Sequence, residues 1–264
     1  MPALVMLATH EWSPSRTDAG APAPVAVLVH GITGWWRTWW RVAPALSDRG
    51  WRVIALDQRG HGSSPPIDGI ATAGSLAADI GATLDALGVV PVDLLVGHSL
   101  GAAVCMELVH RRPDVARRLV IEDPPGQDRA DDLPFQQNLE REVRAAGADD
   151  DGEVRRALAE NPTWLDEDAR QDVAGKAASD LDGIMASLRS GTGLRVIDLA
   201  PTIRIPALYL LASEDLSALG SRRADFIDSL PTSASLVEVD SGHTVHRDRF
   251  EAYLSALLGW LDDA

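Results

Sequence analysis

The sequence predicts an α/β fold in which a mostly parallel β-sheet is covered by helices on both faces. Short, unbroken apolar runs alternate along the chain with segments whose apolar residues recur at helical spacing. Such runs suit strands that are buried on both faces, and their alternation with helices is typical of parallel sheets. Several runs are also followed by glycine-bearing polar loops, where the backbone can approach a ligand closely.

Composition limits the classes of partner. The 264 residues are 45% hydrophobic and 24% charged, as in an ordinary soluble globular protein. The formal net charge of −15 argues against nucleic acid or an anionic membrane as a partner, because both are polyanions. A small neutral or weakly charged substrate fits better. The residues leave the oligomeric state open between monomer and homodimer.

Cysteine usage and the first residues indicate the compartment. The single cysteine, Cys105, cannot form an internal disulfide, which suits a reducing environment, and its position in a helical pattern predicts a core residue. The first twelve residues contain a short apolar run with no basic region ahead of it, unlike a secretion signal. No apolar stretch reaches the length needed to span a bilayer. We therefore expect a cytoplasmic protein.

The first elements are strands. Residues 3–8 and 11–16 resemble two short strands, and residues 25–29 form an unbroken apolar run that predicts a buried strand. That run ends in a glycine-bearing loop, residues 30–34, in which we expect His30 to hold the loop by a hydrogen bond.

Half of the eight tryptophans follow at once, at positions 35, 36, 39 and 40. At helical spacing Trp36 shares one face with Trp40, and Trp35 shares another with Trp39. One pair can pack into the core while the other faces a pocket mouth. Packing alone and a hydrophobic wall for an apolar substrate are equally good interpretations.

A strand over 51–56 leads into a loop, residues 57–64, that is rich in turn-forming residues. We expect Asp57 and Arg59 to hold this loop in a structural role. Residues 75–88 then show helical spacing and end at a glycine, which predicts a helix.

The most informative stretch is Gly97-His98-Ser99-Leu100-Gly101, which lies between an apolar run at 92–96 and a helical pattern at 102–110. In that context G-x-S-x-G predicts a nucleophile elbow, a strained turn that pushes the serine hydroxyl clear of the sheet. Only glycine fits two positions either side of Ser99. The N–H groups of Leu100 and Ile32 are candidate oxyanion donors.

A strand over 118–121 ends at Glu122, and the pattern then changes. Residues 126–201 are acidic, contain amphipathic helical segments and show no convincing strand, which predicts a helical insertion over the sheet. The apolar residues of this insertion either pack it on the sheet or line a substrate cavity. They include Phe135, Trp164, Leu181, Ile184, Met185, Leu188 and Leu194. The candidate pocket residues selected from the whole chain are Trp36, His98, Trp164, Met185 and Leu188.

The alternating pattern returns after the insertion. A strand over 205–211 is followed by Glu214 and Asp215, a helix over 221–230 and a strand over 235–239. Residues 240–246, which contain His243 and His246, come next. A closing helix is predicted over 249–261.

The chain resembles the α/β-hydrolase superfamily over nearly its whole length. The motifs that carry the resemblance, in order, are HGITG, DQRGHGSS, GHSLG, the acid after IPALYLL, and SGHTVHRD. The resemblance implies an eight-stranded, mostly parallel sheet with a helical cap inserted after the sixth strand. The core domain would comprise residues 1–125 and 202–264, and the cap residues 126–201.

The resemblance also implies a serine, acid and histidine triad. His243 would take the proton of Ser99, and a carboxylate would fix the imidazole tautomer. Asp215, after the seventh strand of the family, is the favoured acid, and Glu122, after the sixth, is the alternative. His246 is expected to be structural. With no HExxH motif or cysteine cluster, neither metal nor cofactor is expected.

The expected activity is cleavage of a carboxylic ester or lactone of a small hydrophobic molecule through an acyl-enzyme on Ser99. Haloalkane dehalogenases and epoxide hydrolases resemble this fold but have aspartate at the elbow. Amide or C–C bond hydrolysis and cofactor-free perhydrolysis are the alternatives. A hydrolase-like receptor for a small ligand is the alternative from outside the enzymes.

Overall fold

A computed structural model describes residues 4–14, 22–127 and 129–263, and within them seven strands form one sheet in the order β1-β3-β2-β4-β5-β6-β7. Only β1 is antiparallel to its neighbour, so the expected mostly parallel sheet is confirmed. The strands are β1 (Thr9–Trp12), β2 (Val25–Val29), β3 (Arg52–Leu56), β4 (Leu94–His98), β5 (Leu119–Glu122), β6 (Ala207–Leu211) and β7 (Ser235–Glu238).

The described residues therefore hold seven strands and not the eight expected. Residues 4–8 form no strand, because Val5 and Leu7 donate their backbone N–H groups to side chains of the helix at residues 73–87, at 3.0 and 3.1 Å. The second predicted strand, 11–16, overlaps with β1, which runs from Thr9 to Trp12. Ala3 and Arg16, at the ends of these predictions, lie outside the described residues.

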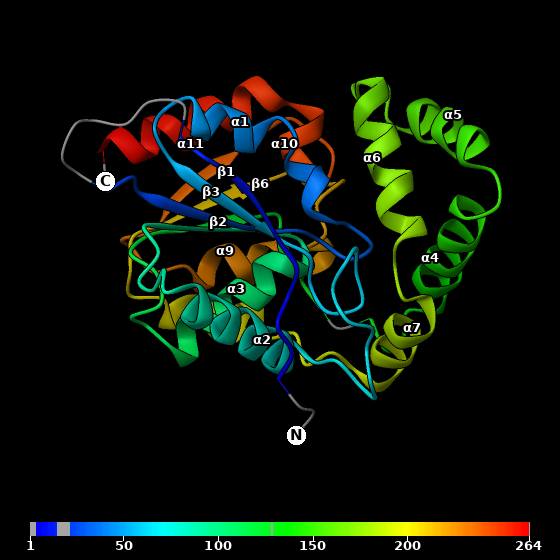
Figure 1. Cartoon of the computed structure of the whole chain (residues 1–264), viewed down its shortest axis with the longest axis horizontal. Coiled ribbons are helices and arrows are strands. Elements are labelled where there is room, and N and C mark those ends of the chain that lie inside the picture. Colours follow the sequence, from blue (N-terminus) through cyan, green and yellow to red (C-terminus); the bar gives the residue numbers. More distant parts are fainter. Residues whose placement is uncertain (1–3, 15–21, 128, 264) are drawn as a thin grey trace.

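Helices cover both faces of the sheet (Figure 1). They are α1 (Val42–Ser47), α2 (Ala73–Leu87), α3 (Leu100–Arg111), α4 (Leu133–Ala146), α5 (Asp150–Glu160), α6 (Asp166–Ala177), α7 (Leu181–Ser190), α8 (Val196–Leu199), α9 (Arg223–Ser229), α10 (Val245–Asp248) and α11 (Phe250–Asp263), with 3₁₀ turns η1 (Trp36–Trp39), η2 (Ala200–Thr202) and η3 (Gly220–Arg222).

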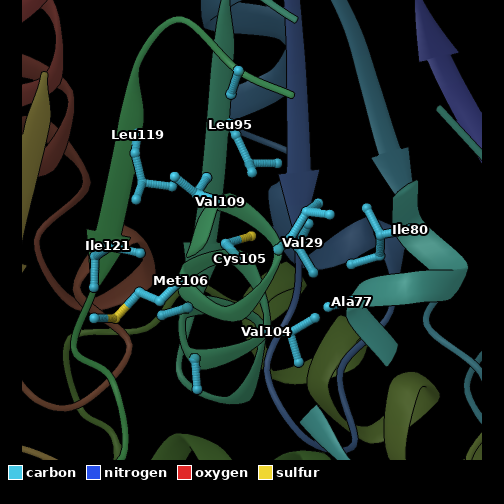
Figure 2. Close-up of a cluster of buried hydrophobic side chains, with 14 of the residues drawn as sticks. Val29, Ala77, Ile80, Leu95, Val104, Cys105, Met106, Val109, Leu119 and Ile121 are labelled. Carbon is cyan, nitrogen blue, oxygen red and sulfur yellow. The ribbon is translucent and has the colours of Figure 1, made fainter. Parts of the chain in front are cut away.

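Each face of the sheet contributes to its own hydrophobic cluster, since successive strand residues point to opposite faces. Along β2, Val27 and Val29 pack with α2, α3, α8 and α9, whereas Ala26 and Leu28 pack with α1 and α11. Figure 2 shows the first cluster, where the buried Cys105 lies among apolar side chains as predicted.

The four helices α4 to α7 come between β5 and β6 in the sequence. They stand to one side of the sheet, near α10 (Figure 1). They have two small apolar clusters of their own, built around Val173 and around Met185. The following helix, α8, packs into the main core instead through Val196 and Leu199. In the described part of the chain, no helix combines the length and apolar character needed to cross a membrane.

Candidate active site

Ser99 occupies a strained turn between β4 and α3. Its backbone has φ 53° and ψ −120°, a conformation that side-chain-bearing residues rarely adopt, and it is the residue that precedes the first turn of α3. A Cβ on Gly97 would lie 2.5 Å from the carbonyl oxygen of Gly101, and one on Gly101 would collide with the backbone of Val29 and His30. Both glycines are therefore required by the close approach of α3 to β2 and β4.

The loop after β2 lies against this turn, as a Cβ on Gly31 would be 3.0 Å from the Cβ of Ser99. Thr33 has φ 57° and donates its N–H to His61 Nε2 at 3.2 Å. His30 accepts the N–H of Gln58 at Nε2 and lies 2.7 Å from the carbonyl oxygen of Gly31 through Nδ1. His30 thus holds the loop, as predicted.

Two backbone N–H groups near Ser99 are left for a ligand. Leu100 begins α3, so its N–H has no helical acceptor. Within the described ranges, neither Leu100 nor Ile32 donates its N–H to another backbone or side-chain group, and both residues line the cavity that contains Ser99. The positive end of α3 favours negative charge at the same point.

The acid beside His243 is Asp123, which the sequence analysis did not select. Its Oδ2 lies 2.6 Å from His243 Nδ1. The carboxylate is fully buried and also accepts hydrogen bonds from the hydroxyl of Ser217 at 2.6 Å and from the N–H groups of Ala212 and Ala218. These partners fix the carboxylate, and the carboxylate in turn fixes the ring of His243.

The prediction that Asp215 or Glu122 contacts His243 is therefore wrong. Asp215 is exposed in the loop after β6. Glu122 is still part of β5, where strand alternation points it to the same face as Val120, and it pairs there with His246. The strand ends at Glu122, and Asp123, with φ 38°, turns toward His243. The sequence signal was the pair of adjacent carboxylates that follows the apolar run, and the structure shows that only the second lies beyond the strand.

His98 also contacts His243, through its ring and through a hydrogen bond. The two ring centroids are 4.7 Å apart, and burial lowers the pKa of His98 well below its usual value. Its Nε2 lies 3.2 Å from the carbonyl oxygen of His243 and donates to it. His98 thereby ties the end of β4 to the loop that carries His243.

Ser99 and His243 line a common cavity of about 430 Å³. Of the candidate pocket residues, His98 and Leu188 line it, but Trp36, Trp164 and Met185 do not. Phe135, Ile184 and Leu194, which were also possible lining residues of the insertion, do line it, and so do the candidate oxyanion donors Ile32 and Leu100. The apolar lining residues that were not predicted are Ile67, Ala71, Leu76, Pro125, Leu216 and Ala218.

The three misplaced residues pack elsewhere. Trp36 stacks on His10 with ring centroids 4.0 Å apart. Trp164 lies under the Arg247 guanidinium and donates its Nε1–H to Asp248 at 3.1 Å. Met185, on α7, is 4% exposed among apolar neighbours.

The tryptophan cluster does not form a substrate wall. Trp39 is fully buried in the core, which agrees with the packing interpretation. Trp35 donates its Nε1–H to the carbonyl oxygen of Gln171 at 3.0 Å, and Trp40 donates to Asp168 at 2.9 Å. Both acceptors belong to α6, so these rings anchor that helix to the sheet domain.

The positive charges in the cavity wall are compensated. Arg59 pairs with Asp79 at 2.7 Å, Arg129 with Asp132 at 2.6 Å, and Arg247 with Asp172 at 2.9 Å.

Asp57 holds its loop, as predicted, because it accepts the N–H groups of Trp36 and Ser63 at 2.8 and 2.9 Å.

A model of the alpha/beta hydrolase fold family matches residues 24–250. The chain belongs to the α/β-hydrolase fold family. This α/β-hydrolase is 30% identical to the "Putative non-heme bromoperoxidase BpoC" of Mycobacterium tuberculosis, over 91% of this chain and 94% of that protein. It is 39% identical to the sn-1-specific diacylglycerol lipase ABHD11 of Mus musculus, but that match spans only 40% of this chain and 34% of the mouse protein.

Among solved structures, the α/β-hydrolase is similar in fold to the enol-lactonase from Burkholderia xenovorans LB400. The two superpose with a TM-score of 0.77 over 98% of this chain and 97% of the other, at 21% sequence identity. At that level of identity the similarity shows the fold alone.

Proposed function

We propose that this α/β-hydrolase is a serine hydrolase that cleaves a carboxylic ester or lactone of a small hydrophobic molecule. The observation that carries the proposal is the grouping of Ser99 and His243 in one cavity, with His243 Nδ1 lying 2.6 Å from Asp123. Asp123 replaces Asp215 and Glu122 as the proposed acid. A nucleophile, a base and an orienting carboxylate are the parts that acyl transfer needs.

In the proposed reaction, Ser99 Oγ attacks the substrate carbonyl carbon while its proton moves to His243 Nε2. The carbonyl oxygen becomes an oxyanion, which the N–H groups of Ile32 and Leu100 would stabilise. The tetrahedral intermediate expels the alkoxide, which takes the proton from His243, and an acyl-enzyme remains. Water then attacks the acyl carbon, gives its proton to His243, and the acid is released as Ser99 regains that proton.

The cavity supports an uncharged, mostly apolar substrate. Its wall includes the aliphatic side chains of Ile184, Leu188 and Leu194 and the ring of Phe135. The arginines in the wall already have carboxylate partners, so they offer little uncompensated charge to an anionic ligand. A cavity of about 430 Å³ lies within the usual range for small-molecule sites.

Perhydrolysis is a second candidate because a relative that aligns over nearly the whole chain is named as a bromoperoxidase. The same acyl-enzyme would be attacked by hydrogen peroxide in place of water, which releases a peracid. Adding peroxide to an ester assay and measuring peracid separates this reaction from simple hydrolysis.

The test is steady-state hydrolysis of p-nitrophenyl esters of increasing chain length. We expect the parent to turn over and Ser99→Ala to lose at least about 10³-fold in kcat, because alanine lacks the hydroxyl that forms the acyl-enzyme. Ser229→Ala, at the end of α9, is the matched control and should retain the parent rate. Equal turnover by Ser99→Ala would disprove the nucleophile, and a parent inert to every ester and to fluorophosphonate labelling would favour a receptor.

A further inference from the structure

A second carboxylate–histidine pair lies next to the first in the sequence and in space. Glu122 precedes Asp123, and His246 follows His243 by three residues. His246 Nδ1 lies 2.9 Å from both carboxylate oxygens of Glu122, and the backbone N–H of His246 donates to one of them at 2.9 Å. The end of β5 therefore holds α10 through one residue and His243 through the next.

This second pair is shielded from substrate. The side chains of Glu122 and His246 are 0% and 1% exposed, and neither residue is among those that line the cavity. The His246 ring stacks on Trp39 with centroids 4.4 Å apart. A direct chemical role is excluded by this burial, so any effect on catalysis must act through other residues.

The hydrogen bonds of the pair form a connected network. Thr38 Oγ accepts from Arg247 Nη2 at 2.9 Å, which leaves its hydroxyl hydrogen for His246 Nε2, also at 2.9 Å. His246 then carries its ring proton on Nδ1 and donates it to Glu122. Both ring nitrogens of His246 thus have hydrogen-bond partners, and paired buried groups of this kind favour a single local arrangement.

Glu122 also holds the nucleophile turn. Its carbonyl oxygen accepts the backbone N–H of Ser99 at 2.9 Å, while its carboxylate holds His246. One residue thus connects the backbone of the proposed nucleophile to the short helix that follows the proposed base. Displacement of α10 relative to Glu122 would move His243 relative to Ser99.

We infer that Glu122 and His246 are positioning residues, which set the alignment of His243 against Ser99 without touching substrate. The inference rests on the proposed function, since it assigns these residues to the activation of Ser99. The bonds from Asp123 and His98 orient the ring and carbonyl of His243, and the Glu122–His246 pair fixes the backbone segment that follows it.

The test compares two replacements of His246 that separate hydrogen bonding from packing. His246→Asn keeps an N–H donor at the place of Nδ1 but loses the ring, whereas His246→Phe keeps a ring against Trp39 but loses the donor. The readout is the second-order rate at which a fluorophosphonate labels Ser99 in the full chain, measured by mass spectrometry, with the melting temperature of each variant measured in parallel.

A positioning role predicts that His246→Phe labels about 10- to 100-fold more slowly, as expected for displaced catalytic groups, while His246→Asn stays within fivefold of the parent. With ester substrates the loss should appear in kcat and leave KM within threefold. If the pair serves packing only, the order reverses, with Phe near the parent and Asn slow. That order, or equal rates for both variants, overturns the inference.

Glu122→Gln provides a second measurement if His246→Phe does not fold. Its matched control is Glu107→Gln, which neutralises another buried, ion-paired carboxylate on α3, away from the cavity. Slower labelling in Glu122→Gln alone supports the inference, and equal rates in both overturn it. A parent that is not labelled at Ser99 disproves the proposed function itself, whereas a labelled parent with unaffected variants disproves only the positioning role.

Discussion

Asp123 shows how one side chain is prepared to orient a histidine. Its Oδ1 accepts from Ser217 and Ala212, and its Oδ2 accepts from Ala218 and faces His243. All of these partners favour a carboxylate that cannot rotate. Its backbone, at φ 38°, is strained for a residue with a side chain, a feature that concentrates at functional sites.

We expect Asp123→Asn to lower kcat for ester hydrolysis by about 10⁴-fold, because an amide can present an N–H₂ group to His243 and select the wrong tautomer. Asp215→Asn, at the exposed position that the sequence favoured, should stay within twofold of the parent. Steady-state kinetics on both variants decide between the two acids. A large loss in Asp215→Asn together with normal kinetics in Asp123→Asn would return the assignment to Asp215.

At the scale of elements, the packing of α3 against β2 sets the position of Ser99. A Cβ on Gly101 would meet the backbone carbonyls of Val29, the last residue of the central strand β2, and of His30, which follows it. We expect Gly101→Ala to destabilise the fold by about 1–3 kcal/mol, as overpacking does, and to abolish labelling of Ser99.

The control for this substitution is Gly259→Ala in α11, an exposed helical position where a Cβ meets nothing within 4 Å. It should stabilise the fold by about 0.5–1 kcal/mol and leave labelling unchanged. Urea unfolding supplies the free energies and the fluorophosphonate rate the reactivity. Parent-like labelling in Gly101→Ala would show that the elbow tolerates a shift of α3.

The same elements show what the sequence can predict. The elbow was predictable because strand, turn and helix are contiguous in the sequence, and because glycines at 97 and 101 mark positions where a Cβ would collide with the backbone. The acid was not, because the choice between Glu122 and Asp123 depends on the residue at which β5 ends. The sequence left the role of the tryptophans at 35 and 40 open between packing and a substrate wall, because their partners lie on α6, more than a hundred residues away.

At the scale of the whole molecule, the parallel sheet brings together groups that are remote in sequence. The loop with Ile32 follows β2, Ser99 follows β4, Asp123 follows β5 and His243 follows β7. These parallel strands all end at the same edge of the sheet, which is where α/β folds place their ligand sites. The insertion α4–α7 then closes the cavity over this edge, since Phe135, Ile184 and Leu188 line it.

Burial of His30 and His61 makes the stability of the fold depend on pH, because it disfavours their charged forms. Burial lowers the pKa of His30 to about 4 and that of His61 to about 3, against about 6.5 in the unfolded chain. Between these values the unfolded state binds protons that the folded state does not. The free energy of unfolding must therefore fall as pH drops below about 6.5. His30 alone lowers it by roughly 3 kcal/mol by pH 4.

Urea unfolding between pH 7.5 and 5.0 measures this slope in a range where most carboxylates stay ionised. His61→Gln keeps an acceptor for the Thr33 N–H but removes the titrating ring, so we expect a shallower slope than in the parent. His110→Gln, at an exposed histidine near the end of α3, controls for the loss of one imidazole and should keep the parent slope. Equal slopes in the parent and His61→Gln would mean that the folded state accommodates a proton on this ring, and the loop that carries Ile32 would then adjust with pH.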